Sequence, residues 1–476
     1  MSTKTCSYRK CNRKVYGNTD KCILHCDKNK EEPYKEFTGE LDSLIQENIN
    51  NKVTQIKLET IVFPNQEKNM HFIGKLNKLE AIHFYKCQFM GTTLALNENV
   101  KSRFENCTFH NNWHLYNLYV LNSPSIFDDN YDVLYKKCIF KQEIKSKKNL
   151  FERKKRTIEA KQFDNCKFHS IQFSNTTFKE QVFNGMDNRF DESAIISIDN
   201  CSIENKFVLN KHKVEKLEIK DTIFKSKFEF RENNEVSMEI INSNFEGIFD
   251  CNLNIFSSFY MEKSIFYKFV GFEESIFEAK NGLATTFKYV SFLDYSYFRG
   301  AKFNIGLDLE TTNMEVYPNF LNAYIEPKNT NRETFRIIKY SFDNIGNTIE
   351  ANKYFAYEMN KERENKDNSL DKKILLNLNY WISNFGQSWL RPMLLIIIFA
   401  FIHTLLFKAI DSNTFQFIDS SLIKSVINFL NDVVKNMIPL KKSLAEGKEF
   451  ISLMFLIVYS VLIYNLVIAL KRTTKR

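Results

Sequence analysis

Phenylalanine recurs at every fifth position between residues 161 and 185, KQFDNCKFHSIQFSNTTFKEQVFNG. The five are Phe163, Phe168, Phe173, Phe178 and Phe183. A helix places its apolar residues three and four apart, and a half-buried strand places them at every second position. A strict period of five fits neither, and it indicates a chain that turns a corner every pentad and points one large side chain toward a shared axis. A repeat this short predicts a solenoid, in which each unit buries its apolar face against its neighbours.

The same period continues on both sides of this stretch, with shifts of phase. Upstream members are Phe84, Phe89, Leu94, Phe104 and Phe109, with Asn99 as the one lapse. Downstream members are Ile198, Ile203, Val208, Ile219, Phe224, Ile240, Phe245, Phe256, Met261, Phe266, Phe272, Phe277, Phe287, Phe292, Phe298 and Phe303. The residue two places before the large one is often small or apolar, as at Cys166, Thr176 and Ser243. An ordinary β-sandwich rich in phenylalanine has no reason to keep this period.

This pattern resembles the pentapeptide-repeat family, whose unit holds a small residue, a polar residue, then Leu or Phe. The resemblance covers residues 55–305 and implies a mainly β fold, a right-handed quadrilateral parallel β-helix with one pentad on each face. With about 20 residues per coil and strands ~4.8 Å apart, the rod would be on the order of 50 Å long. We expect the regular repeat over 81–305 and, over 36–80, a short helix followed by irregular first coils.

A basic run, KQEIKSKKNLFERKKRTIEAK at residues 141–161, interrupts the repeat. Such a run is typical of a solvated loop or short helix. The functional alternative is an electrostatic contact with anionic lipid headgroups or nucleic acid. Phe151 is the only aromatic residue within the run, so the solvated insertion is preferred.

The N-terminal segment, residues 1–35, carries a candidate metal site and no apolar stretch of the kind that a signal peptide requires. Cys6, Cys11, Cys22 and His25 have the types and spacing of a tetrahedral zinc set, C-x4-C-x10-C-x2-H. The C-I-L-H string also resembles a small Cys/His knuckle that precedes pentapeptide repeats in some bacterial proteins. Cys26 stands beside His25 and is an alternative fourth ligand. The competing interpretation is a basic tail with chance cysteines.

The other six cysteines are interpreted as small fillers of the solenoid, because each lies two places before an apolar residue of the repeat. They are Cys87, Cys107, Cys138, Cys166, Cys201 and Cys251. Buried free thiols behave as small hydrophobes. We therefore expect no disulfides and a reducing cytosolic environment for the solenoid.

After the repeat the apolar spacing becomes helical. Residues 328–366 predict a helical hairpin broken near Gly346, which would cap the open end of the solenoid. A polar linker at 364–371 follows it. The segment 372–392 then carries Trp381 and Arg391, the kind of aromatic and basic anchors expected of an interfacial amphipathic segment at a membrane surface.

The region 393–476 predicts two membrane spans. The apolar segments 393–410 and 450–470 are close to the length of about 20 residues that a spanning helix needs. Basic residues before the first span and the closing KRTTKR place both termini in the cytosol by the positive-inside rule. We expect a multi-pass protein of the inner (cytoplasmic) membrane. His403 lies within the first span, and intramembrane ionisable residues are functional candidates.

The tail resembles the C-terminal part of bacterial pentapeptide-repeat membrane proteins, on the strings YFAYEMNKERE and Asn384-Phe385-Gly386. Relatives of that layout carry a two-span potassium-channel module. A potassium filter needs a T-V-G-Y-G-like loop, and the stretch 411–449 offers only Gly447. Residues 420–438 predict an amphipathic helix in the pore-helix position. The resemblance therefore implies a two-span scaffold with a degenerate, ion-channel-like region and no selectivity.

Composition narrows the function further. The net charge of +9 has acids and bases interspersed, which argues against an acidic mimic of DNA. The sequence has no phosphate loop, dinucleotide fingerprint or nucleophile elbow, so we expect no enzyme. The preferred hypothesis is a membrane-anchored cytosolic scaffold that presents the rod to a protein partner. The alternative is a subunit of a homo-oligomeric, non-selective two-span channel with the rod as regulator. Nucleic acid is the least favoured partner.

Overall fold

The computed structural model describes residues 4–9, 11–28, 34–65, 71–94, 96–97, 100–115, 133–146, 156–184, 187–410, 422–437 and 448–474. The chain forms two compact units, Met1–Asn329 and Thr330–Arg476. Three residues singled out from the sequence, Asn99, Phe151 and Gly447, lie outside the described residues.

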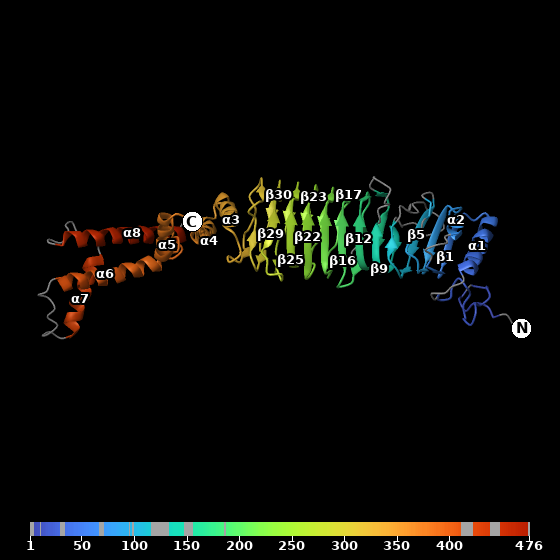
Figure 1. Cartoon of the computed structure of the whole chain (residues 1–476), viewed down its shortest axis with the longest axis horizontal. Coiled ribbons are helices and arrows are strands. Elements are labelled where there is room, and N and C mark those ends of the chain that lie inside the picture. The colour runs from blue at the N-terminus through green and yellow to red at the C-terminus, as the bar shows by residue number, and fades with distance from the viewer. Residues whose placement is uncertain are drawn as a thin grey trace. The chain divides into compact units, whose positions relative to one another are not determined.

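The first unit is a parallel β-solenoid whose strands form four sheets and stack in chain order (Figure 1). One sheet holds β1 (Gln55–Glu59), β3 (Ala81–Tyr85), β5 (Lys101–Glu105), β8 (Val133–Lys136), β11 (Lys161–Asp164) and β14 (Phe183–Asn184). A second holds β18 (Phe207–Val208), β21 (Phe228–Glu229), β24 (Phe249–Asp250), β27 (Val270–Gly271) and β31 (Ser296–Tyr297). A third holds β10 (Arg156–Ile158), β13 (Thr176–Phe178), β17 (Ser202–Ile203), β20 (Ile223–Phe224), β23 (Asn244–Phe245), β26 (Ile265–Phe266), β30 (Ser291–Phe292) and β34 (Asn313–Met314).

The fourth sheet is the largest of those in the described residues, with sixteen strands. They are β2 (Val62–Phe63), β4 (Gln88–Phe89), β6 (Thr108–Phe109), β7 (Trp113–His114), β9 (Ile139–Ser146), β12 (Lys167–Ser174), β15 (Arg189–Phe190), β16 (Ile195–Asp199), β19 (Lys216–Lys220), β22 (Val236–Ile241), β25 (Ile255–Glu262), β28 (Ile276–Phe277), β29 (Thr285–Lys288), β32 (Lys302–Phe303), β33 (Leu307–Asp308) and β35 (Tyr324–Ile325). Its long strands bend to supply two sides of a coil: the first half of β25 pairs with β28 and the second half with β29. With β26 and β27, such a coil has four sides. The predicted parallel solenoid is confirmed, and its right-handedness stays a prediction.

The coils explain the shifts of phase in the sequence. In the regular part of the solenoid, Phe224 pairs with Phe245, and the corner residue Thr222 bonds to Ser243, 21 residues further on. A coil therefore holds four pentads and one further residue. Because of this extra residue, the positions of the large side chains shift by one residue from each coil to the next, relative to a strict period of five.

Columns of stacked rings fill the interior. The ring centroids of Phe224 and Phe245 are 5.0 Å apart with an interplanar angle of 3°, and those of Phe245 and Phe266 are 4.8 Å apart with an angle of 6°. A neighbouring column, with Phe228 and Phe249, meets this one edge to face, with Phe245 and Phe249 at 4.7 Å. Offset stacking within a column and edge-to-face contact between columns are both favourable for aromatic rings. The large residues of the five-residue repeat therefore fill the interior of the solenoid.

The corners explain the small residue two places before each large one. At several corners the backbone enters the left-handed region, as at Asn200 (φ 48°), Asp221 (φ 49°) and Asn242 (φ 48°). The next residue is small, and its side chain closes the turn, with Ser243 Oγ donating to the Ile241 carbonyl at 2.8 Å. Asn and Asp tolerate this conformation better than most residues. Cysteine fills the same position at Cys201, whose thiol contacts the Asp199 carbonyl at 3.3 Å.

Three features of the first unit differ from the sequence interpretation. The strands begin at Gln55, within the lead-in where the first coils were expected, but they continue to Ile325, beyond the expected end at residue 305. The helix expected at the start of the lead-in is observed as α1 (Tyr34–Asn50), but a second helix, α2 (His71–Leu76), was not expected. The basic run 141–161 is not simply a loop or helix: β9 extends to Ser146 and β10 begins at Arg156, because alternate side chains such as Ile144 and Ile158 are buried. Residues 147–155 lie outside the described part.

The second unit is helical. Its helices are α3 (Arg332–Asn344), α4 (Thr348–Glu364), α5 (Leu370–Ser383), α6 (Leu390–Ile410), α7 (Leu422–Met437) and α8 (Glu449–Thr474). The predicted hairpin is confirmed as α3 and α4, with Phe335, Ile338 and Tyr354 buried between them. Asn331 caps the first helix and Asn347 the second, each through its side-chain oxygen. Whether this hairpin caps the solenoid stays a prediction.

Two helices of the second unit, α6 and α8, are long and apolar enough to cross a membrane. They contact each other and α7 through a small cluster that includes Ala400, Val433 and Tyr459. Most of the surface of both helices remains exposed and apolar, for example at Ile398 and Ile457. The amphipathic helix expected over 420–438 is observed as α7.

Candidate metal centre

Two tight turns of the N-terminal segment bring the candidate ligands together. Thr5 forms an antiparallel bridge with Lys14, and the Cys6 N–H donates to the Arg13 carbonyl at 2.9 Å. Within this turn the Cys11 N–H donates to the Tyr8 carbonyl at 3.0 Å. The chain then returns through a second turn, in which the N–H groups of residues 25 and 26 both donate to the carbonyl of residue 22, at 3.0 and 2.9 Å.

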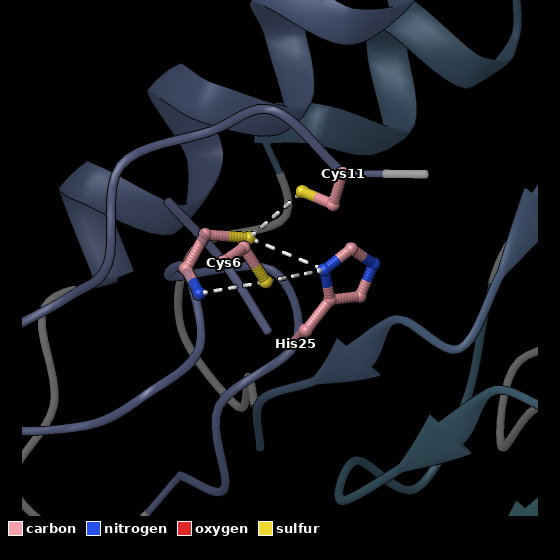
Figure 2. Close-up of side chains that lie close together, drawn as sticks. Cys6, Cys11 and His25 are labelled. Carbon is pink, nitrogen blue, oxygen red and sulfur yellow. Dashed lines mark hydrogen bonds between the residues drawn. The ribbon is translucent and has the colours of Figure 1, made fainter. Parts of the chain in front are cut away.

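The ligand atoms of Cys6, Cys11, Cys22 and His25 all lie within 4.8 Å of one another. Figure 2 shows the Cys6 and Cys11 side chains and the His25 ring converging from separate parts of this segment. His25 Nδ1 is 3.6 Å from the Cys6 sulfur and 3.2 Å from the Cys22 sulfur, and the Cys11 and Cys22 sulfurs are 3.7 Å apart. These four residues, which are the set predicted from the sequence, could hold a metal ion.

The structure also separates the two candidates for the fourth ligand. His25 directs Nδ1 at two of the three sulfurs. Cys26 is buried outside the group, with its sulfur 3.7 Å from the Ile23 carbonyl oxygen. The helical turn of residues 22–26 places positions 22 and 25 on one side and turns position 26 away from them. The observed set is therefore three thiols and one imidazole.

Burial and hydrogen bonding give the four groups different proton affinities. Burial raises the pKa of Cys22 to about 12, and the neighbouring Cys11 sulfur adds to the effect. Burial acts on Cys6 too, but hydrogen bonds from the backbone at Cys22 and Tyr8 outweigh it and lower the pKa of that thiol. Burial lowers the pKa of His25, so the imidazole is neutral at pH 7, the form that binds metals. A bound cation would favour the thiolate forms of the cysteines.

Contacts beyond the ligands join this segment to the solenoid. The Glu59 carbonyl at the end of β1 hydrogen-bonds with His25, an arrangement common around metal-binding histidines. The Val62 N–H donates to the Leu24 carbonyl at 2.9 Å, which continues the bonding pattern of β2 one step before the first coil. No sequence pattern pointed to Glu59, since its partner is 34 positions away and the contact uses the backbone.

Helix α1 completes the covering of this end. Its Phe37 ring lies 5.9 Å from Phe63 of the first coil, and Leu41 and Ile45 are fully buried along the same face. Arg13 of the N-terminal segment forms an ion pair with Glu40 of α1. The N-terminal segment and helix α1 together therefore cover the exposed edge of the first coil.

The remaining predicted candidate, His403, has no comparable surroundings. Its ring stacks on Phe455 of α8 with centroids 4.2 Å apart and meets Phe407 at 4.6 Å. Among the residues that the structure describes, no second group of three or more His, Cys, Asp or Glu side chains is placed to hold an ion.

Comparisons of the chain with models of protein families, with curated proteins and with solved structures give no match. The resemblance to pentapeptide repeats and to two-span membrane proteins therefore stays a prediction.

Proposed function

We propose that this protein is a membrane-anchored scaffold without catalytic activity, which presents a β-solenoid to a protein partner. The observation that carries the proposal is the apolar surface of α6 and α8. Side chains such as Ile457 and Val467 are more than half exposed, at 52% and 57%. Leaving such area in water costs about 25 cal/mol per Å², and a bilayer removes that cost.

The solenoid supports the interaction role because its own interior is closed. Phenylalanine columns fill the space inside the coils, so recognition belongs to the outer faces. On one face, Ile248, Tyr295 and Tyr317 occupy corresponding positions of different coils, and each is exposed. The coil before that of Ile248 has Lys227 at this position. Exposed tyrosines are common anchors in protein interfaces, so the tyrosine end of the face is the preferred site for a partner.

We further propose that the metal at the N-terminal site is structural zinc. With Zn–S bonds of about 2.3 Å and Zn–N bonds of about 2.0 Å, a tetrahedral site has ligand separations of about 3.8 Å for S···S and about 3.5 Å for S···N. The observed separations of 3.7, 3.6 and 3.2 Å are close to these values. Three thiolates and one histidine fill all four positions, as in structural rather than catalytic sites.

The proposal places the solenoid and both termini in the cytosol of a cell with a cytoplasmic membrane. Extraction of membranes tests the anchor: full-length protein should resist carbonate and high salt and require detergent. A reporter fused after Arg476 should be cytosolic, and one inserted at Gly447 should lie on the opposite side. Release by high salt alone would contradict a spanning anchor.

The channel alternative is supported by one observation, the helix α7 between the two spans. Its polar side contacts α6, where Asp432 pairs with Lys408 at 3.1 Å and the Asn436 side-chain amide donates to Thr404 at 2.9 Å. Its exposed surface has an apolar side, with Val426 and Val434 half exposed or more, and a polar side, with Asn428, Asn431 and Lys435 exposed. Stoichiometry in mild detergent and conductance in a planar bilayer distinguish the two: a non-conducting monomer favours the scaffold.

A further inference from the structure

Helix α5 has two apolar sides, and the residues that the structure describes cover one of them. On the covered side, Leu376 packs with Ala356 of α4 and with Phe385. The uncovered side holds Leu370, Ile374, Leu378 and Trp381, which are 79%, 61%, 53% and 70% exposed. These positions are four, four and three apart, so they form one stripe along the helix. A 14-residue helix with this much exposed apolar surface is made to contact something outside the chain.

Basic side chains without carboxylate partners among the described residues surround the same helix. The guanidinium of Arg363 lies 3.8 Å from the centre of the Tyr380 ring, and that of Arg391 lies 5.8 Å from it. Lys373 Nζ donates to the Lys366 carbonyl at 2.8 Å. None of these three cations forms an ion pair with a described residue, whereas the nearby Lys372 pairs with Glu362. The surroundings of the stripe are therefore suited to an anionic surface.

The chain also fixes the position of α5 relative to the candidate spans. After Ser383, residues 384–386 all have positive φ values, 47°, 54° and 83°, and α6 begins four residues later. Arg472 near the end of α8 donates to the Phe385 carbonyl, and Ser383 Oγ lies 3.2 Å from the Asn465 side-chain oxygen of α8. Glycine suits position 386, since its φ is positive and a Cβ would lie 2.8 Å from the Arg472 side chain. The turn thus holds α5 against the ends of both helices.

We propose that the exposed stripe of α5 lies in the interface of a bilayer that carries anionic lipids. The inference rests on the proposed membrane anchor and adds the site of lipid contact and the lipid charge. A helix fixed at the end of a spanning helix lies at headgroup depth, where Trp and aliphatic side chains are favoured. Lys and Arg beside it attract anionic headgroups. A protein partner is disfavoured as the contact of this stripe, because the proposed anchor already places the membrane at the end of α5.

The contact has a consequence for the hairpin α3–α4. Glu362 at the end of α4 is nearly buried and pairs with both Arg332 and Lys372, which join α3, α4 and α5. Leu376 adds the apolar contact with α4. When α5 lies in the interface, the hairpin is held at the membrane surface by these contacts.

Tryptophan fluorescence tests the inference in the full-length protein. The chain has three tryptophans, of which Trp113 is buried inside the solenoid, so Trp389→Phe leaves Trp381 as the one reporter near the membrane. This variant is reconstituted into vesicles of equal parts phosphatidylcholine and phosphatidylglycerol, with brominated acyl chains on one lipid or the other. Trp381 should be quenched in both cases, by about twofold more when bromine is on the anionic lipid. Trp381→Phe in the same background gives the contribution of Trp113.

The double substitution Arg363→Gln and Lys373→Gln, which leaves Arg391, should keep the quenching and reduce the preference for the brominated anionic lipid. Unquenched Trp381 in protein that stays with the vesicles at high salt would overturn the inference and leave the anchor intact. Equal quenching by the two lipids would overturn the anionic preference. Protein that leaves the vesicles at high salt would contradict the proposed anchor itself.

Discussion

The N-terminal segment and the first coils of the solenoid both bury cysteines, and they use them in opposite ways. In residues 4–28, three thiols converge on one point with His25. In the coils, the thiols of Cys107 and Cys138 each face the backbone, with sulfur to carbonyl oxygen distances of 3.3 and 3.5 Å to the preceding coil. Burial raises the pKa of Cys87 and Cys138 well above the ordinary value, so they stay neutral fillers.

The difference shows what each region depends on for stability. A coil adds large phenylalanine side chains to columns that run through its neighbours, so a thiol there needs only to be small. The N-terminal segment is too short for a core of its own, and a metal ion held by its four candidate ligands would supply the stability that phenylalanine supplies in the coils. Cysteine is thus a candidate metal ligand where apolar area is scarce and a small filler where apolar area is abundant.

Replacing a candidate ligand in the N-terminal segment should have a larger effect on folding than any of the changes in the coils described below. Cys22→Ser should abolish metal binding and unfold residues 4–28, because metal affinity in sites of this size corresponds to about 10–16 kcal/mol of apparent folding free energy. Metal analysis of the wild type should give one zinc per chain, and hydrogen exchange should show loss of protection confined to the first edge of the solenoid.

Cys138→Ser is the matched control for that change. A serine there can still donate to the carbonyls that the thiol contacts, as Ser243 does in a later coil. The variant should keep its zinc and most of its stability. Equal loss of zinc from Cys138→Ser and Cys22→Ser, or a zinc-free wild type from zinc-replete medium, would contradict the site.

Phe245→Ala should destabilise the solenoid by about 3–5 kcal/mol, through lost burial and a cavity between two stacked rings. Phe245 is 1% exposed, between Phe224 and Phe266. Glu246→Ala, one position later on the exposed face, should change the free energy of unfolding by less than about 0.5 kcal/mol. Chemical denaturation of both variants measures the difference, and similar midpoints would show that the columns do not carry the stability.

His212 should make the solenoid less stable in acid. Burial lowers its pKa to about 4, below the ordinary value, so the folded state favours the neutral ring. Above about pH 6.5 the ring is neutral in both states. As the pH falls from about 6.5 to 4 the unfolded chain binds the proton first, and stability decreases by up to about 3 kcal/mol.

His212→Gln should remove that part of the pH dependence, and His169→Gln should not, because His169 is half exposed on the surface. Denaturation midpoints at pH 7 and pH 5 measure the effect. An unchanged pH dependence in His212→Gln would show that the ring accepts a proton in the folded solenoid.

Ser243→Ala should have the smallest effect. It removes a hydroxyl that donates to the Ile241 carbonyl at 2.8 Å and accepts from the Thr222 N–H at 3.2 Å. The buried groups left behind cost about 1–2 kcal/mol. Ser197→Ala, at a partly exposed position on a flat side, is the control and should be close to neutral. Equal effects in the two variants would show that the corner bonds contribute nothing.

The sequence alone determined the features that depend on local periodicity and spacing. A period of five predicted a solenoid because each pentad makes one side, and the small residue two places before each ring was recognised as part of the repeat. The spacing of Cys6, Cys11, Cys22 and His25 predicted the ligand set, since both turns are short. The hairpin α3–α4 and the two apolar helices were also predicted, because the pattern of each is contained in one helix or turn.

Only the tertiary structure decided what depends on neighbours in other coils. Phe173 lies in the middle of the five regularly spaced phenylalanines, yet its partners in the adjacent coils are Ser146 and Ile198, because the register between coils varies with the residues inserted in each. Cys251 was interpreted as a small filler two places before an apolar residue of the repeat, but that residue, Leu253, lies exposed at a corner with φ 61°. The five-residue period predicts which side chains point inward, but the length of each coil determines which of these side chains contact one another.

The same reason applies to the ends of the two units. Choosing His25 over Cys26 required the turn that orients them, and the contact with Glu59 required the first coil. The two apolar sides of α5 became distinct only when α4 covered Leu376 and left Trp381 exposed. Amphipathic spacing shows that a helix has an apolar side, but the helix that packs against it decides which apolar residues stay exposed.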